Sequence, residues 1–244
     1  MAREIWLAGV DGCRQGWVAA FLRKAGGDVT LRVMPAFADV LSSPERPAIV
    51  AVDMPIGLPE RIGPGGRGPE RAVRPLLGAR QSSVFSVPSR AAIHAGDYRA
   101  ACRVAAATSE PPRKVSKQLF MIVRKIREVD AALRADAVAA ARVYEVHPEV
   151  AFWRLNGECA LDQPKKVKGR PHEAGLALRR RLLIGAGIAP AIACAPPPAG
   201  AAADDLVDAL ACAAIARRIH AGQAQPFPRD YARDAFGLPI AIWA

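Results

Sequence analysis

Five acidic residues stand at or near the ends of apolar segments: Asp11, Asp53, Glu145, Asp205 and Asp208. Asp11 directly follows the apolar run Glu4–Val10, and Asp53 directly follows the run Ala48–Val52. If both runs are neighbouring parallel strands, the two acids converge, because the carboxyl ends of parallel strands form the ligand-binding edge of an open α/β sheet. Grouped carboxylates repel one another unless a cation neutralises them. A site made only of oxygen ligands selects Mg²⁺ or Mn²⁺.

Each acid also has an ordinary structural explanation. Asp11 can belong to a turn with Gly12, Asp205 can cap a helix, and the helix dipole favours Asp208 in a first turn. Their joint occurrence favours a metal site instead. Two ions held roughly 3.5–4 Å apart can activate a water and stabilise the leaving oxygen of a phosphodiester displacement. This chemistry needs no Cys, Ser or His nucleophile. His147 could move a proton or bind substrate, and the alternative is a structural imidazole.

A second group of residues suits phosphate oxygens, because guanidinium groups and hydroxyls donate hydrogen bonds to them. Its members are Arg71, Arg74, Arg80, Ser82, Ser83 and Arg90. We interpret them as a substrate-binding segment, and the alternative is a basic loop that packs on the sheet. The shorter basic run Lys165–Arg170 is typical of a solvated, flexible loop.

The order of apolar runs predicts the elements that position these residues. Strands are expected at Glu4–Val10, Gly16–Leu22, Val29–Met34, Ala48–Val52 and Arg142–Val146. The first three are separated by short polar turns, which indicates an antiparallel meander. Helices are expected at Phe37–Leu41, Lys117–Leu133, Glu173–Leu183 and Asp204–His220. A meander joined to parallel strands predicts an α/β fold with one mixed sheet flanked by helices.

Length and composition place this arrangement in one domain over residues 1–244, with a largely helical insertion at about 55–140. We expect residues 55 to 113 to be irregular. The formal net charge of +11 permits binding to a polyanion. The five scattered cysteines form no zinc pattern and suggest reduced thiols. The chain carries no recognisable signal peptide or bilayer-spanning run, so we expect a soluble, cytoplasmic protein without a membrane partner.

Five ordered motifs between about residues 5 and 220 resemble those of the DUF429 family: AGVDGCRQGWVAA, VAVDMPIGLPE, RPLLGARQSSVFSVPSR, YEVHPEVAF and DDLVDALACA. The resemblance implies an RNase H-like fold and a predicted nuclease activity. The pattern is similar to the Holliday-junction-resolvase-like branch of that superfamily. There a first-strand Asp, a fourth-strand acid and two acids on the last helix bind two divalent ions. By position these are Asp11, Asp53, Asp205 and Asp208, with Glu145 as a fifth candidate.

The resulting hypothesis is a divalent-metal-dependent nuclease that hydrolyses DNA or RNA with the help of two Mg²⁺ or Mn²⁺ ions. One alternative is a non-catalytic nucleic-acid-binding module, which would have no reason to gather carboxylates. Another is an actin-like phosphotransferase, which normally needs two such domains and more than 244 residues. Fold alone does not decide between these activities.

Overall fold

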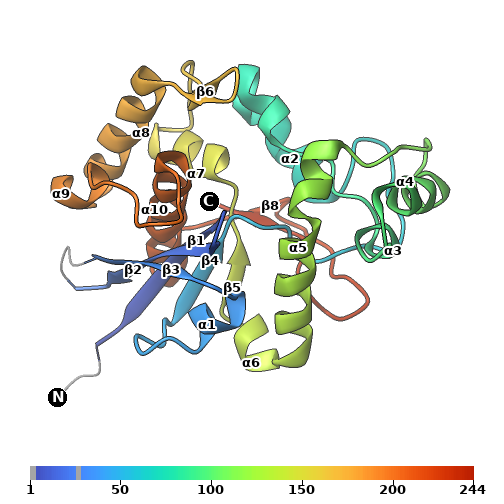
Figure 1. Ribbon diagram of the computed structural model, residues 1–244, viewed down its shortest axis with the longest axis horizontal. Coiled ribbons are helices and arrows are strands. Elements are labelled where there is room, and N and C mark those ends of the chain that lie inside the picture. The colour runs from blue at the N-terminus through green and yellow to red at the C-terminus, as the bar shows by residue number, and fades with distance from the viewer. Residues whose placement is uncertain (1–3, 26–28) are drawn as a thin grey trace.

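A computed structural model of the chain describes residues 4–25 and 29–244. Its centre is a seven-stranded mixed sheet with the strand order β3-β2-β1-β4-β5-β9-β8 (Figure 1). The strands are β1 Trp6–Cys13, β2 Gly16–Arg23, β3 Val29–Met34, β4 Ile49–Val52, β5 Val143–Glu145, β8 Pro226–Phe227 and β9 Ile242–Trp243. Strands β6 Lys166–Val167 and β7 Arg170–Pro171 form a separate two-stranded ribbon. The predicted mixed α/β sheet is confirmed.

Pairing in the sheet follows the predicted plan. Strand β2 is antiparallel to both β1 and β3, whereas β1, β4 and β5 are parallel neighbours. Strand β1 runs to Cys13, three residues beyond the predicted end, because Asp11 still pairs with Val18 of β2. The pairing of β1 with β4 ends at Val10 and Val52, one residue before Asp11. Asp11 therefore lies inside a strand that has lost its partner on one side.

Helices cover both faces of the sheet and build the insertion. They are α1 Phe37–Leu41, α2 Gly68–Val73, α3 Arg90–Ile93, α4 Tyr98–Ala107, α5 Lys117–Ala135, α6 Ala137–Ala140, α7 Pro148–Leu155, α8 Glu173–Gly185, α9 Pro190–Ala193 and α10 Ala203–His220, with a 3₁₀ segment, η1, at Arg74–Ser83. The described part of the chain contains no helix that is long and apolar enough to cross a membrane.

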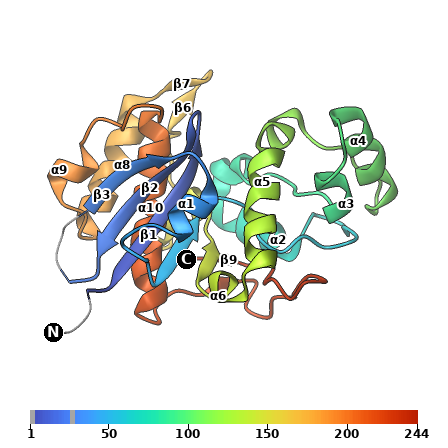
Figure 2. The same cartoon turned by 60° about the horizontal axis from the view of Figure 1, so that its bottom comes forward.

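The expectation of irregular structure from residue 55 to 113 is wrong, because α2, η1, α3 and α4 all fall within it. Proline, glycine and arginine dilute the apolar periodicity there. Asp97 caps the start of α4, and its carboxylate accepts a hydrogen bond from the Ala100 amide at 2.8 Å. Such an Asp before a helix is a standard N-cap signal. In Figures 1 and 2, helices α3 and α4 of the insertion lie on the far side of α5 from the meander.

The sheet separates two apolar cores, because successive side chains of a strand point to opposite faces. Leu7 and Ala51 belong to the core beneath α7, α8 and α10. Ala8 and Val52 belong to the core beneath α1 and α5. Helix α10 lies directly on β1 and is buried from Leu206 to Ala216. Both cores together fix which strand residues face α10.

Candidate functional site

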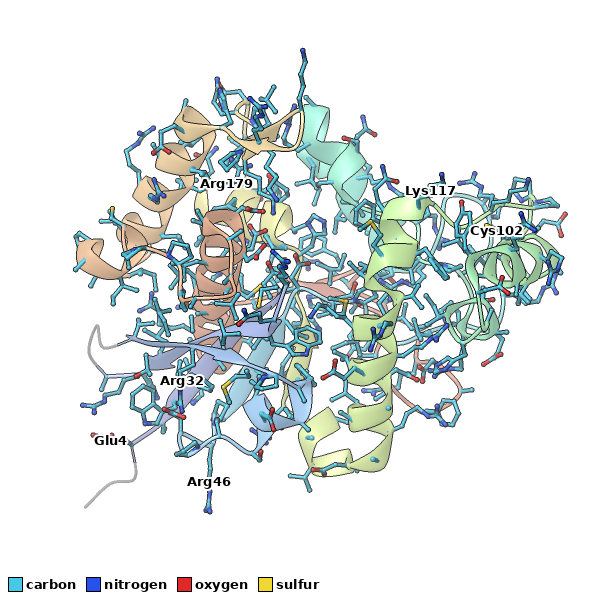
Figure 3. The ribbon with its side chains drawn as sticks, in the orientation of Figure 1. Glu4, Arg32, Arg46, Cys102, Lys117 and Arg179 are labelled. Carbon is cyan, nitrogen blue, oxygen red and sulfur yellow. The ribbon has the colours of Figure 1, made fainter. Side chains whose placement is uncertain are left out.

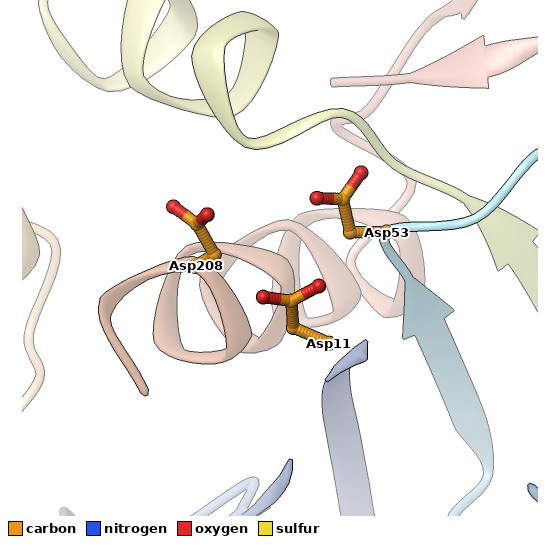
Figure 4. A group of neighbouring side chains, drawn as sticks. All are labelled: Asp11, Asp53 and Asp208. Carbon is orange, nitrogen blue, oxygen red and sulfur yellow. The ribbon is translucent and has the colours of Figure 1, made fainter. Parts of the chain in front are cut away.

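Three acidic side chains meet at one edge of the sheet. Asp11 comes from β1, Asp53 follows β4, and Asp208 projects from the second turn of α10 (Figure 4). One oxygen from each of the three carboxylates lies within 4.8 Å of the other two. The structure thus brings together three of the five predicted acids. We call Asp11, Asp53 and Asp208 the carboxylate triad.

The alternation of side chains explains why these three meet. Asp11 lies four residues after Leu7 and Asp53 two residues after Ala51, so both continue the rows that face α10. The Asp53 amide donates a hydrogen bond to the Val10 carbonyl at 2.9 Å, which keeps the two strand ends in register. Helix α10 then supplies Asp208 from above the same face.

The triad is electrostatically unfavourable without a cation. Burial, followed by repulsion from Asp53 and Asp208, raises the pKa of Asp11 well above its ordinary range. Burial and repulsion from Asp208 raise the pKa of Asp53 to about 8. Burial also raises the pKa of Asp208 to about 6, although Lys165 opposes this shift. Protons must therefore be held at the triad, or a bound cation must replace them.

Hydrogen bonds leave much of the triad free for a ligand. The Gly12 amide donates to Asp11 Oδ1 at 2.7 Å. The other carboxylates are less well satisfied: within residues 4–25 and 29–244, Asp208 Oδ1 is buried without a hydrogen-bond partner. A buried, unpaired carboxylate oxygen is costly unless something absent from the chain itself, such as a metal ion, contacts it. The donor set is made only of oxygen atoms, which fits Mg²⁺ or Mn²⁺.

Lys165 joins the triad through an ion pair with Asp208. Burial alone would lower its pKa, but the charges of Asp208, Asp11 and Asp53 outweigh burial and hold the pKa above its ordinary range. The sequence interpretation of Lys165–Arg170 as a solvated loop missed this contact. The only available signal was the basic run itself, which does not say that the loop folds back onto α10.

Glu145, a predicted metal ligand, is engaged elsewhere. Its carboxylate accepts hydrogen bonds from Arg67 at 2.7 Å and from the Ile56 amide at 2.7 Å. Both Arg67 and Glu145 are buried. Glu145 pairs with Val52 and lies two residues after Val143, so it shares the face that packs against α5 rather than α10. Alternation thus places Glu145 outside the triad, although Glu145 lines the neighbouring cavity and its charge contributes to the raised pKa of Asp53.

Asp205 is the second predicted ligand that the structure does not bring into the triad. Its carboxylate accepts a hydrogen bond from the Ala202 amide at 2.9 Å, which satisfies the start of α10. Its neighbour Asp204 pairs with Lys166 at 2.5 Å. Of the acids at the start of this helix, only Asp208 is in the triad.

A cavity of about 310 Å³ opens beside the triad. Polar residues in its lining are Asp11, Asp53, Arg67, Glu70, Ser83, Lys125, Glu145, His147, Glu149 and Lys165. His147 Nε2 lies 3.3 Å from the Ser83 carbonyl, and within the described chain its buried Nδ1 has no hydrogen-bond partner. Burial lowers the pKa of His147, which keeps the imidazole neutral. His147 thus lines the cavity with an imidazole whose burial favours the neutral form.

A family model described as "Protein of unknown function (DUF429)" matches residues 9–233. The chain belongs to the DUF429 family. No curated protein and no solved structure matches it. The matched region contains the whole triad together with Lys165 and His147, and the resemblance found from the sequence motifs is thereby confirmed.

In this DUF429 protein, most arginines of the predicted phosphate-binding segment contact the protein itself. Arg71 donates to the Gly66 carbonyl at 2.7 Å, and Arg74 donates to the Gly65 carbonyl at 2.6 Å. Arg90 is buried and pairs with Asp130 and with Asp234, which joins the insertion to the C-terminal segment. These arginines hold the insertion in place, and Arg90 does not line the cavity.

Arg80 and the two serines remain available. Among the described residues, no side chain or carbonyl accepts a hydrogen bond from the Arg80 guanidinium. Ser83 lines the cavity beside the triad, and its hydroxyl donates to the Arg80 carbonyl at 2.8 Å. Ser82 lines an adjoining cavity, and the half-exposed Phe85 borders both. Ser82 and Ser83, at the end of η1, are therefore the members of the predicted segment that line these two cavities, whereas Arg80 lines neither of them.

Proposed function

We propose that this DUF429 protein is a divalent-metal-dependent hydrolase of phosphodiester bonds in nucleic acid. The observation that carries the proposal is the triad of Asp11, Asp53 and Asp208, whose oxygens lie within 4.8 Å of one another beside a cavity. An inert binding module gains nothing from burying three mutually repelling carboxylates. This supports an enzyme over a non-catalytic module.

Asp11, Asp53 and Asp208 would hold Mg²⁺ or Mn²⁺. A bound divalent ion lowers the pKa of a coordinated water and stabilises negative charge on phosphate oxygens. The chain's own residues supply the remaining functions. His147 lines the cavity and can accept a proton, and the Arg80 guanidinium, which has no hydrogen-bond partner in the described chain, can donate to a phosphate oxygen away from the triad.

The charge of the whole protein supports a polyanionic substrate. The formal net charge is +11, even though three acids are concentrated at the site. An excess of positive charge over the whole protein attracts a polyanion. DNA and RNA are the polyanions that carry the phosphodiester bonds this chemistry cleaves.

Hydrolysis of single-stranded, duplex, branched and hybrid oligonucleotides, measured with Mn²⁺, Mg²⁺ and EDTA, tests the proposal. Asp11→Asn and Asp53→Asn should each lower the rate by about 100-fold or more, since each removes a ligand whose metal supplies several kcal/mol. Their melting temperatures without metal should be unchanged or higher, because one repelling charge is gone.

Asp205→Asn is the matched control. It changes the same functional group on the same helix, but its carboxylate caps α10 and is not part of the triad. It should keep both Mn²⁺ affinity and activity. Equal Mn²⁺ affinity in the wild type and in both triad variants would rule out the assigned site.

A further inference from the structure

Lys165 is held in place by contacts on both sides of its loop, which connects α7 to α8. The Lys165 carbonyl accepts a hydrogen bond from the His172 amide at 2.9 Å. The Gln163 carbonyl accepts one from Arg179 at 2.9 Å, and Arg179 is fully buried and pairs with Glu149 at 2.6 Å. Figure 3 shows Arg179 close to α7, α8 and α10. The loop is thus anchored, and its lysine is directed at the triad by the fold.

The ammonium group of Lys165 contacts one carboxylate of the triad. It pairs with Asp208 Oδ2, while Asp208 Oδ1 is buried without a partner in the described chain. Its side chain is 27% exposed and lines the cavity beside the triad. Lys165 is positioned to contact both the triad and a phosphate group bound there.

The charges of the site fit one divalent ion. Once a bound cation has displaced the protons, the three carboxylates carry −3 and Lys165 carries +1, which leaves −2. The other acids near the triad are already satisfied: Glu145 and Glu70 pair with Arg67, Glu149 pairs with Arg179, and Asp205 caps α10. A second divalent ion would leave the buried site with an excess of positive charge, which is costly in a low-dielectric environment.

We propose that Lys165 occupies the place of the second cation, so that the triad binds one divalent ion and the ammonium group positions the phosphate. This inference rests on the proposed function and replaces the two-ion expectation from the sequence. Lys165 is a positioning residue at Asp208, and it limits the metal stoichiometry of the site.

This inference can be tested without measuring activity, by titrating the full chain with Mn²⁺. Calorimetry and the EPR signal of free Mn²⁺ then report how many ions bind and how tightly. The wild type should bind one ion. Lys165→Met should bind the first ion at least about tenfold more tightly, because a nearby positive charge is gone, and should gain a second ion. Lys165→Arg keeps the charge and should still bind one ion.

Lys166→Met is the matched control, because Lys166 is the next residue and pairs with Asp204 outside the triad. It should bind one ion with wild-type affinity. Lys165→Gln provides a second neutral variant if Lys165→Met does not fold, as judged by thermal melting.

The outcomes separate this inference from the proposed function. Two ions in the wild type, or neutral Lys165 variants with wild-type stoichiometry and affinity, would overturn the role of Lys165 but leave a metal-dependent hydrolase in place. A wild type that binds no Mn²⁺ would overturn both.

Discussion

Gly9 of β1 lies so close to Ala213 of α10 that a Cβ atom on Gly9 would be 2.0 Å from the Ala213 amide nitrogen. Real carbon and nitrogen atoms that are not bonded do not approach so closely. The contact brings the helix down onto the strand that carries Asp11, and Asp208 lies just over one turn earlier in the same helix. The missing side chain at Gly9 therefore sets the distance between two members of the triad.

Gly9→Ala should destabilise the protein because the obstacle is helix backbone, which cannot move aside as a flexible side chain could. Overpacking of this kind costs about 1–3 kcal/mol or more. Gly185→Ala is the control, since nothing lies within 4 Å of a Cβ atom there. Urea unfolding of both variants gives the comparison. Equal stability of Gly9→Ala and wild type would show that α10 can move away from β1.

The fold could largely be predicted because its strands are apolar and are bounded by clear turns. Helix α1 and strand β3 coincide with their predicted ranges, Phe37–Leu41 and Val29–Met34. Helix α7, which begins at Pro148, and the short strands β8 and β9 were not predicted. Strands of two residues are too short for any periodicity, and they depend on pairing with residues far along the chain.

The site was only partly predictable for a related reason. Strands buried on both faces read as continuous apolar runs, so their sequence does not tell which side chains face α10. The sequence therefore does not show that Asp11 and Asp53 face α10 whereas Glu145 faces α5, and this becomes clear only when the two cores are known. Lys165 meets Asp208 across 43 positions of the chain. No local pattern encodes that contact.

Glu145→Gln distinguishes a structural ion pair from a metal ligand. The change leaves Arg67 buried with a weaker partner, and loss of one member of a buried pair costs about 3–5 kcal/mol. Arg67 keeps its contact with Glu70, so we expect about 3 kcal/mol, measured by urea unfolding. Mn²⁺ affinity should not change.

Glu158→Gln is the control for this experiment, because Glu158 pairs with Arg154 in an exposed position. It should cost less than about 1 kcal/mol. If Glu145→Gln keeps its fold but loses much of its Mn²⁺ affinity, Glu145 is a metal ligand and the assignment as a structural ion pair is wrong.

The metal-free protein should lose stability as the pH rises. Burial, together with repulsion from Asp208, raises the pKa of Asp53 from 3.8 in the unfolded chain to about 8 in the folded protein. Between these values the folded state holds a proton that the unfolded state has released, so stability falls with increasing pH. Below 3.8 both states are protonated, and above about 8 the loss is complete.

Asp53→Asn cannot ionise, so its melting temperature should fall less steeply than that of the wild type across this pH window. Saturating Mn²⁺ should remove most of the difference in slope, because the ion takes over the role of the proton. The measurement is a series of thermal melts in EDTA and in Mn²⁺. Parallel curves for the two proteins in EDTA would contradict the raised pKa of Asp53.

Arg80 and Arg90 should behave differently, although the sequence assigned both to phosphate binding. Arg80→Ala removes a guanidinium without a partner in the described chain, so it should leave stability unchanged while lowering the salt dependence of oligonucleotide binding. The slope of log K against log salt should fall by about 0.9 on duplex DNA.

Arg90→Ala leaves Asp130 and Asp234 buried without their main partner, so it should cost about 3–5 kcal/mol of stability. Its salt slope should match that of the wild type at temperatures where it is folded. Binding titrations between low and moderate salt, combined with thermal melts, distinguish the two roles. A variant that makes one phosphate contact fewer releases fewer counterions when it binds, and its slope must be smaller. An unchanged slope in Arg80→Ala would therefore mean that Arg80 does not contact phosphate.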